Sequence, residues 1–185
     1  MSKKSKRIQR RKLNRYTGEQ FEWYVTEYFN NYMDKYGMDG LAYIYPLHPD
    51  HTQKIDVLID NFDSMFIGIE CKSIYEDGHP LHTQQTECFR NARLYFSKLF
   101  NINKTKQSQI YRQRQFLRCT NRYGLIAFEF RCLNEVFFVP YNVVYRVWKS
   151  GRKFITVKEV ITNSYQIGSS RSLIEFIANK CEVTK

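Results

Sequence analysis

The chain has 185 residues, of which 43% are hydrophobic and 16% aromatic, which is enough apolar material for one folded domain. Its formal net charge is +11 at pH 7, and no stretch reaches the roughly 18 uncharged apolar residues that a membrane span needs. No apolar segment follows the basic start, so we expect neither a secretory signal nor a membrane partner. Five cysteines without a C-x-x-C pair argue against a disulfide framework and favour a reducing, cytoplasmic setting.

Two segments concentrate the positive charge. Residues 1–18 carry eight basic side chains and residues 101–128 carry six, and neither segment contains an acidic residue. Both are typical of surfaces that bind a polyanion, although a solvated tail and a solvated helix face are the alternative. The residues expected to contact DNA are Lys3, Lys4, Lys6, Arg7, Arg10, Arg11, Lys12 and Arg15 in the first segment, and Arg112, Arg114, Arg118 and Arg122 in the second.

The beginning of the chain predicts an arm followed by a helix. Residues 1–15 lack an apolar face, so we predict a flexible basic arm ahead of a single domain over residues 16–185. Thr17-Gly18-Glu19-Gln20 is typical of a capping box, which predicts that a helix begins there. That helix is expected to end near Gly37, and its apolar positions follow the helical spacing at Phe21, Val25, Tyr28, Phe29 and Tyr32.

The remaining elements alternate between strands and helices. Residues 41–45 are extended, residues 54–60 alternate as a half-buried strand, and a turn at 61–64 leads into a second strand at 65–72. In the expected first strand, Ile55, Val57 and Ile59 point one way and Asp56, Leu58 and Asp60 the other. Further along we predict helices over 83–100 and 108–121, a hairpin of 125–131 with 136–139, a short helix over 141–148, a strand over 154–161 and a helix over 172–179. This order predicts an α/β domain with a mixed β-sheet flanked by helices.

Three charged residues are expected to meet at the end of the two paired strands. Glu70 and Lys72 share one face of their strand, and hairpin pairing brings Asp56 nearly opposite Glu70. Two carboxylates form a hard-oxygen site suited to Mg²⁺, for which Mn²⁺ can substitute, and such a metal activates a bound water. Lys72 would orient this water or stabilise the charge of the transition state. The alternative is a structural salt bridge between Lys72 and either acid.

The pattern Asp56…Glu70-Cys71-Lys72 resembles the signature of the PD-(D/E)XK nuclease superfamily. Gly18-Glu19-Gln20-Phe21-Glu22 resembles the G-x-x-F/L-E opening of Holliday-junction resolvases of the RecU and Hjc types. The resemblance implies a restriction-endonuclease-like core, and it implies Glu22 as a further acid of the metal site.

A later segment resembles the glutamine-bearing helix and hairpin of RecU. It comprises Gln109-Ile110, Gly124-Leu125-Ile126-Ala127-Phe128 and Val136-Phe137-Phe138-Val139-Pro140. The resemblance implies a glutamine that helps to orient the water, for which we choose Gln109 while Gln107 and Gln113 stay open. Two departures are that Ile55 precedes Asp56 where the superfamily often has Pro, and that residues 76–100 look like an extra helix.

Together these features predict a Mg²⁺-dependent endonuclease that hydrolyses phosphodiester bonds in branched DNA, as a Holliday-junction resolvase of DNA recombination and repair does. Its predicted catalytic residues are Asp56, Glu70, Lys72, Glu22 and Gln109, the three acids also being the predicted metal ligands. A four-way junction is two-fold symmetric, so we expect a homodimer. The alternatives are a restriction- or repair-type nuclease that acts on duplex DNA or DNA ends, and a non-catalytic DNA-binding protein of the same fold.

Two other site chemistries are less favoured. Zinc binding by His48 with His51, or by His79 with His82, is disfavoured because both pairs fall in Pro-containing loops without a cysteine nearby. A Cys71 nucleophile is disfavoured because Cys71 should point away from the acidic face.

Overall fold

The computed structural model describes residues 3–46, 55–74, 91–101, 108–131, 133–169 and 172–180, with the backbone alone described over residues 3–17. A six-stranded sheet in the order β1-β2-β3-β5-β6-β8 forms the centre. β3 and β5 are parallel and the other neighbouring strands are antiparallel, so the sheet is mixed, as predicted. The strands are β1 (Leu41–Ile44), β2 (Val57–Phe62), β3 (Met65–Ile74), β5 (Tyr123–Phe130), β6 (Glu135–Pro140) and β8 (Tyr165–Gln166).

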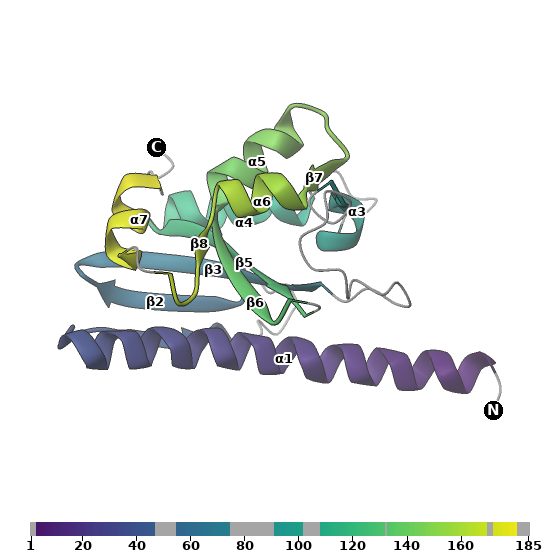
Figure 1. Ribbon diagram of the computed structural model, residues 1–185, viewed down its shortest axis with the longest axis horizontal. Coiled ribbons are helices and arrows are strands. Elements are labelled where there is room, and N and C mark those ends of the chain that lie inside the picture. The colour runs from purple at the N-terminus through teal and green to yellow at the C-terminus, as the bar shows by residue number, and fades with distance from the viewer. Residues whose placement is uncertain are drawn as a thin grey trace.

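Helices cover both faces of this sheet, which confirms the predicted α/β class. Figure 1 shows α1 (Lys3–Tyr36) along one face, with α4 (Gln109–Cys119), α5 (Tyr141–Lys149) and α6 (Val157–Thr162) on the other. A separate two-stranded sheet pairs β4 (Arg93–Tyr95) with β7 (Phe154–Thr156), next to the short α3 (Phe96–Leu99). The final helix is α7 (Leu173–Lys180). Among the described helices, none combines the length and the apolar character needed to cross a membrane.

Each face of the sheet has its own apolar core. On the α1 side, Phe21, Val25, Phe29 and Met33 recur every four residues and are buried against β2 and β3. On the other side, α4 and α5 bury side chains such as Ile110, Leu117 and Val144 against the same strands and β5. Full burial of one such side chain stabilises the folded state by about 1.5–3 kcal/mol. Apolar packing on both faces therefore stabilises the sheet.

A pair of glycines lets α4 approach the sheet closely. Gly68 on β3 pairs with Gly124 on β5, and Leu117 of α4 lies over both of them. A Cβ at either glycine would come within 2.7 Å of the Leu117 side chain, and at Gly124 also within 2.7 Å of the Tyr141 Cβ. Because this contact sets the height of α4 above β3, it also sets the position of the polar side chains that α4 directs toward β3.

The β2–β3 hairpin sets the register of the site. Asp63 and Ser64 have φ values of +47° and +64°, the left-handed conformations that a two-residue hairpin turn requires. The predicted turn at 61–64 is therefore shorter, and Asn61, with φ +61°, lies in an irregularity of the β2 ladder. Beyond it the register is regular, with Ile59 opposite Ile67 and Val57 opposite Ile69.

The structure corrects the predicted character of β2. The strand is buried on both faces rather than half-buried, because helices lie on both sides of the sheet. Val57 and Ile59 join the α1-side core and Leu58 joins the opposite core, as alternation requires. Ile55 lies with Leu58 rather than with Val57, since it precedes the first residue of the strand.

The first helix differs from its predicted start and agrees with its predicted end. The helix runs back to Lys3, so Thr17 is an interior residue and not a cap. Residues 3–16 contain no Gly or Pro and many Lys and Arg, which propagate a helix well, so the backbone of the basic segment continues α1. At the other end Gly37 has φ +63° and Met38 N donates to Met33 O at 2.9 Å, a C-cap that ends the helix as predicted.

Two further predicted elements are wrong in part. Within the predicted helix over 83–100, residues 83–90 lie outside the described residues, and β4 occupies Arg93–Tyr95 ahead of the short α3. Within the predicted strand over 154–161, β7 ends at Thr156 and α6 begins at Val157. Thr156 and Glu159 form a complete capping box there, a T-x-x-E signal that marks the helix start. The predicted extended segment at 41–45, the hairpin and the helices near 108–121, 141–148 and 172–179 are confirmed.

Candidate active site

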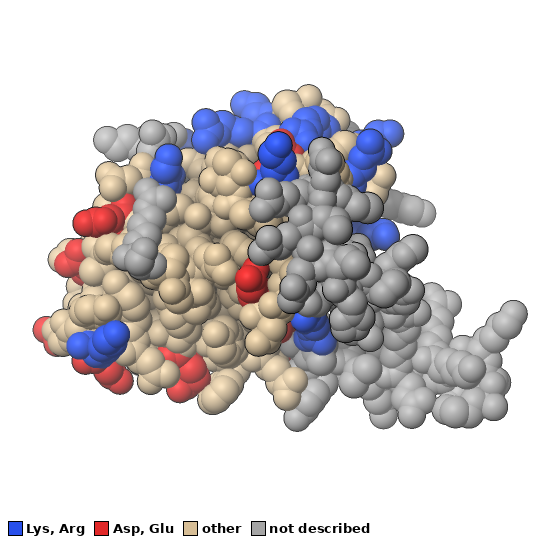
Figure 2. Space-filling view, in the orientation of Figure 1, with Lys and Arg blue, Asp and Glu red and all other residues tan. Residues whose placement is uncertain are grey.

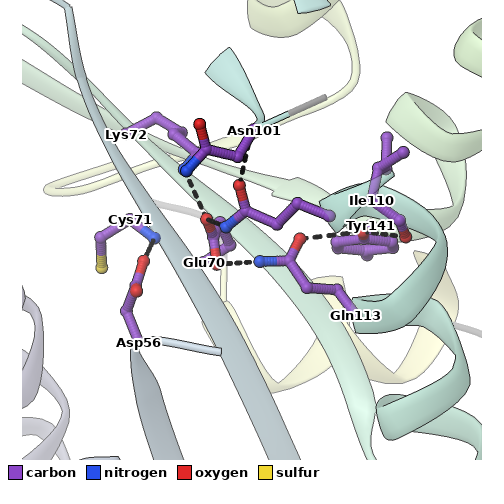
Figure 3. A network of polar contacts seen from close by, with 9 residues as sticks. Asp56, Glu70, Cys71, Lys72, Asn101, Ile110, Gln113 and Tyr141 are labelled. Atoms are coloured by element: carbon purple, nitrogen blue, oxygen red, sulfur yellow. Dashed lines mark hydrogen bonds and ion pairs between the residues drawn. The ribbon is translucent and has the colours of Figure 1, made fainter. Parts of the chain in front are cut away.

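The hairpin register brings Asp56 and Glu70 together. Asp56 immediately precedes Val57, which pairs with Ile69, so Asp56 lies opposite Glu70, as the sequence predicts. The Asp56 backbone N donates to Ile69 O at 3.1 Å, which holds this register at the strand end. Its Oδ2 accepts a hydrogen bond from the Cys71 backbone N at 2.7 Å, which turns the carboxylate toward β3 (Figure 3).

Glu70 is buried and surrounded by hydrogen-bond donors. Its side chain is only 1% exposed and faces α4, where Gln109 Nε2 donates to Oε1 at 3.0 Å. Lys72 donates to the same oxygen and Gln113 to the other. A carboxylate removed from water needs such partners, and these three donors compensate for its burial.

Both candidate glutamines of α4 therefore reach Glu70. Gln109 and Gln113 are four residues apart, so they lie on the same face of the helix. Gln113 is 1% exposed, whereas Gln109 is only partly buried and is the one closer to solvent. The third candidate, Gln107, lies outside the described residues.

A layer of outer contacts orients the two amides. The Tyr141 hydroxyl donates to Gln113 Oε1 at 3.1 Å and to Ile110 O at 2.7 Å. The Asn101 backbone N donates to Gln109 Oε1 at 2.8 Å. Each amide therefore receives a donor on its oxygen and presents its NH₂ group to Glu70 (Figure 3). Sequence reasoning identifies Tyr141 only as the start of a helix, because its contact with α4 depends on tertiary packing.

Lys72 is held in its charged form. Burial by itself lowers the pKa of Lys72, but Glu70 and Asp56 outweigh this effect and the pKa is raised above its ordinary value. Its Nζ also lies 5.2 Å from the centroid of the Phe100 ring, within the range of a cation–π contact. Lys72 is consequently a cation at neutral pH.

Asp56 and Glu22 lack comparable compensation. Burial raises the pKa of Asp56 well above its ordinary value and Glu70 raises it further, against the lowering by Lys72 and the Cys71 hydrogen bond. Burial also raises the pKa of Glu22 to about 7, helped by repulsion from Glu70 and Glu19. The site therefore has more carboxylates than its single ammonium can balance.

Glu22 approaches the site from the opposite face of the sheet. It lies on α1 beside the buried Phe21, within electrostatic range of Glu70 and Lys72. No residue of the described segments donates a hydrogen bond to its carboxylate. In those same segments, no group of three or more His, Cys, Asp or Glu side chains is arranged to hold a metal ion, so Glu22 is near the acid pair without completing a metal centre.

The predicted phosphate-binding arginines fall into different surroundings. Arg118 is exposed and Arg112 is partly buried, while the Arg114 guanidinium stacks on Tyr145 at 4.1 Å. Arg122 is engaged within the protein, because its Nη1 lies 2.6 Å from Asp60 Oδ1 and donates to Ile59 O at 3.3 Å. The structure describes no side chain for Lys3, Lys4, Lys6, Arg7, Arg10, Arg11, Lys12 and Arg15.

The two remaining alternatives for the site are a Cys71 nucleophile and zinc binding by histidines. Cys71 packs against the α1-side core, away from Glu70 and Lys72, as strand alternation predicts. The histidines considered for zinc, His48, His51, His79 and His82, lie outside the described residues.

Comparison with known proteins assigns no family. No family model matches the chain, and no curated protein matches it. The resemblance to PD-(D/E)XK nucleases therefore stays a prediction, and the case for a function depends on the geometry and charge of the site.

Proposed function

We propose that the protein is a Mg²⁺-dependent endonuclease that hydrolyses phosphodiester bonds in DNA. The observation that carries this proposal is the cluster of two opposed carboxylates, Asp56 and Glu70, with a protonated lysine bound to one of them. A third acid, Glu22, lies near this cluster without a hydrogen-bond donor from the described residues, and its pKa is raised to about 7. The raised pKa values of Asp56 and Glu22 are the expected sign of carboxylates that gain from a nearby cation.

The donor set fits Mg²⁺. Mg²⁺ is usually bound by one or two carboxylates together with waters and substrate phosphate oxygens, so Asp56 and Glu70 suffice as its protein ligands. When bound, Mg²⁺ supplies an activated water at neutral pH and neutralises charge on the phosphoryl oxygens. Glu22 would act from the α1 side as a further acid that balances the charge of the ion.

Lys72 would act as a cation and not as a base. Its raised pKa keeps the ammonium protonated at neutral pH, so it has no lone pair with which to take a proton from water. A fixed ammonium beside the reacting phosphate stabilises the negative charge that develops in the transition state. Its bond to Glu70 holds it in place before substrate arrives.

The glutamines would have separate roles. Gln113 is buried and holds Glu70 in position through Tyr141, so it acts through another residue and is a positioning residue. Gln109 is partly exposed and also bonds Glu70, so it is the glutamine that could additionally contact a water or a phosphate.

Branched DNA is the proposed substrate, and a homodimer the proposed active form. Both depend on the resemblance of Gly18-Glu19-Gln20-Phe21-Glu22 to the opening of Holliday-junction resolvases. A two-fold dimer would present two equivalent sites to the two-fold symmetric junction.

Cleavage of a panel of labelled DNAs tests the proposal. The panel contains a four-way junction, a linear duplex and a single strand, each incubated with Mg²⁺, with Mn²⁺ or with chelator. We expect metal-dependent cleavage that falls to background in Asp56→Asn and in Glu70→Gln, with DNA binding retained or tightened because repulsion of phosphates is reduced.

A matched control is Glu175→Gln, an acid on α7 outside the cluster, which should cleave like the wild type. Cleavage by Asp56→Asn or Glu70→Gln at a rate near that of the wild type would rule out the catalytic assignment. Cleavage of the linear duplex at the same rate as the junction would refute the branched substrate while leaving the nuclease intact.

A further inference from the structure

A two-stranded ribbon, β4 with β7, leads directly into the proposed active site. Arg93 pairs with Thr156 and Tyr95 pairs with Phe154 across this ribbon. β4 continues into α3 and then to Phe100 and Asn101, which contact Lys72 and Gln109 respectively. A ligand held by the ribbon would thus lie one short helix away from the acid pair.

Two arginines, Arg93 of β4 and Arg152 just ahead of β7, lie over one aromatic ring of the ribbon. The guanidinium carbons of Arg93 and Arg152 lie 4.7 Å and 5.4 Å from the centroid of the Phe154 ring. Tyr95 approaches the same ring edge-on, with 5.7 Å between centroids, and its own side chain is 39% exposed. This arrangement combines fixed cations with an exposed aromatic surface.

Arg93 and Arg152 differ in how many of their guanidinium N–H donors are already engaged by carboxylates of the described residues. Arg152 donates to both carboxylate oxygens of Glu159, at 2.6 Å and 2.9 Å. Arg93 is exposed, and no carboxylate of the described residues pairs with it. Stacking uses the face of a guanidinium and leaves its N–H donors directed outward from the edge, where a phosphate can accept them.

The surroundings of the ribbon are positively charged. Residues 91–101, 108–128 and 136–158 contain no Asp or Glu. Figure 2 shows Lys and Arg gathered on the side of the molecule where α5 and α6 lie in Figure 1, whereas most of the acids lie elsewhere. The exposed cations of these segments are Arg93, Lys98, Arg118, Arg146, Lys149, Arg152, Lys153 and Lys158. Glu159, which follows these segments directly, is paired with Arg152, so the exposed charges here are mostly positive. A mostly positive surface attracts a polyanion and holds it in a salt-dependent manner.

We propose that the β4–β7 ribbon binds the DNA strand that flanks the scissile phosphate. Arg93 and Lys153 would contact phosphates, and the exposed Tyr95 ring would stack on an unpaired base. The ribbon therefore prefers a single-stranded or unpaired segment, since a base within a duplex has no free face. This inference builds on the proposed nuclease, but its test needs neither metal nor cleavage.

Fluorescence anisotropy of the full chain in chelator tests the ribbon, with a labelled single strand and a duplex of the same sequence titrated at several salt concentrations. We expect Arg93→Gln to weaken binding to both DNAs and to reduce the slope of log K against log[salt] by about 0.7–0.9. Tyr95→Ala should weaken binding of the single strand by about 10-fold while changing duplex binding little, and Tyr95→Phe should bind like the wild type.

Two matched controls separate contact from structure. Lys35→Gln removes an exposed cation near the end of α1, outside the ribbon and its surroundings, so its DNA affinity should stay near that of the wild type. Tyr36→Ala removes a 56% exposed tyrosine at the end of α1 and should have no effect. Thermal melting of every variant identifies any that do not fold.

Different results would refute the proposed role of the ribbon and the proposed nuclease activity. Wild-type affinity in both Arg93→Gln and Tyr95→Ala would overturn the proposal that the ribbon binds DNA, and so would equal losses of affinity in Arg93→Gln and Lys35→Gln. A wild type that binds DNA through Arg93 but never cleaves it with Mg²⁺ would refute the proposed nuclease while supporting the ribbon. A wild type that cleaves DNA with Mg²⁺, together with ribbon variants that bind DNA as the wild type does, would refute the ribbon while supporting the nuclease.

Discussion

The two faces of the central sheet treat their acids differently. On the α4 side, Glu70 is enclosed by Lys72, Gln109 and Gln113, which compensate its charge within the fold. On the α1 side, Glu22 is half-buried, and its pKa is raised to about 7, first by burial and then by Glu70. One acid is therefore preorganised by donors of the protein itself, whereas the other receives no hydrogen-bond donor from the described residues and would gain from a bound cation.

Beyond the loss of Asp56 or Glu70 themselves, the largest expected effect separates two acids of α1. Glu22 is electrostatically coupled to Glu70 and Lys72, while Glu19 is exposed and one turn away. Loss of a residue that hydrogen-bonds a metal ligand typically reduces activity by roughly 10- to 100-fold. Glu22→Gln should slow Mg²⁺-dependent cleavage by more than this, and Glu19→Gln should have little effect. Initial cleavage rates under metal saturation measure the difference, and the reverse ranking would show that α1 contributes to the site through another residue.

On the α4 side, removing the contacts that orient Glu70 should slow cleavage less than removing Glu22 does. Gln113→Leu removes one donor to Glu70 and should reduce cleavage by about 10- to 100-fold. Tyr141→Phe leaves the Gln113 amide oxygen without its donor and should reduce cleavage less than Gln113→Leu does, at a cost of about 1–3 kcal/mol in unfolding free energy.

A positioning role and a merely structural role give different readouts for these two variants. Positioning predicts that kcat falls and that the concentration of Mg²⁺ for half-maximal rate rises, while DNA affinity measured in chelator stays unchanged. Loss of stability with an unaltered Mg²⁺ requirement would mean that Tyr141 and Gln113 serve the fold alone.

The closeness of α4 to the sheet can be disturbed without touching a polar group. Gly124→Ala places a methyl group 2.7 Å from both Leu117 and Tyr141, which must move. Overpacking of this kind costs about 1–3 kcal/mol, so chemical denaturation should show a lower unfolding free energy. Gly18→Ala, a helical position with no neighbouring atom within 4 Å, is the matched control and should not destabilise the protein.

The last expected effect is a pH-dependent contribution of Glu22 to the free energy of unfolding. Its pKa is about 7 in the folded protein against an ordinary 4.5, so between these values the folded chain keeps a proton that the unfolded chain loses. Stability therefore falls as pH rises through this window and the penalty persists above it. In metal-free buffer, Glu22→Gln should melt above the wild type at pH 8 and together with it near pH 4.5. An equal difference at both pH values would assign the effect to packing.

Local signals in the sequence predicted the central part of the site. The alternation at 54–60, the turn at 61–64 and the apolar strand at 65–72 are enough to place Asp56 and Glu70 on neighbouring strands, since side chains alternate with a period of two. The mixed sheet and the helices near 109–119 and 141–149 also follow from local periodicity and Gly or Pro boundaries.

Other features were decided by contacts between distant segments. Arg93–Tyr95 forms a strand because Phe154–Thr156, far along the chain, pairs with it, and its local pattern predicts a helix. The choice between Gln109 and Gln113 was open in the sequence because both lie on one helical face, and their different burial depends on how closely α4 approaches the sheet at Gly68 and Gly124. Tyr141 and Arg93 likewise owe their surroundings to packing. Short-range periodicity determined which residues could share a face, and long-range packing determined which of them are buried, paired or free to bind a ligand.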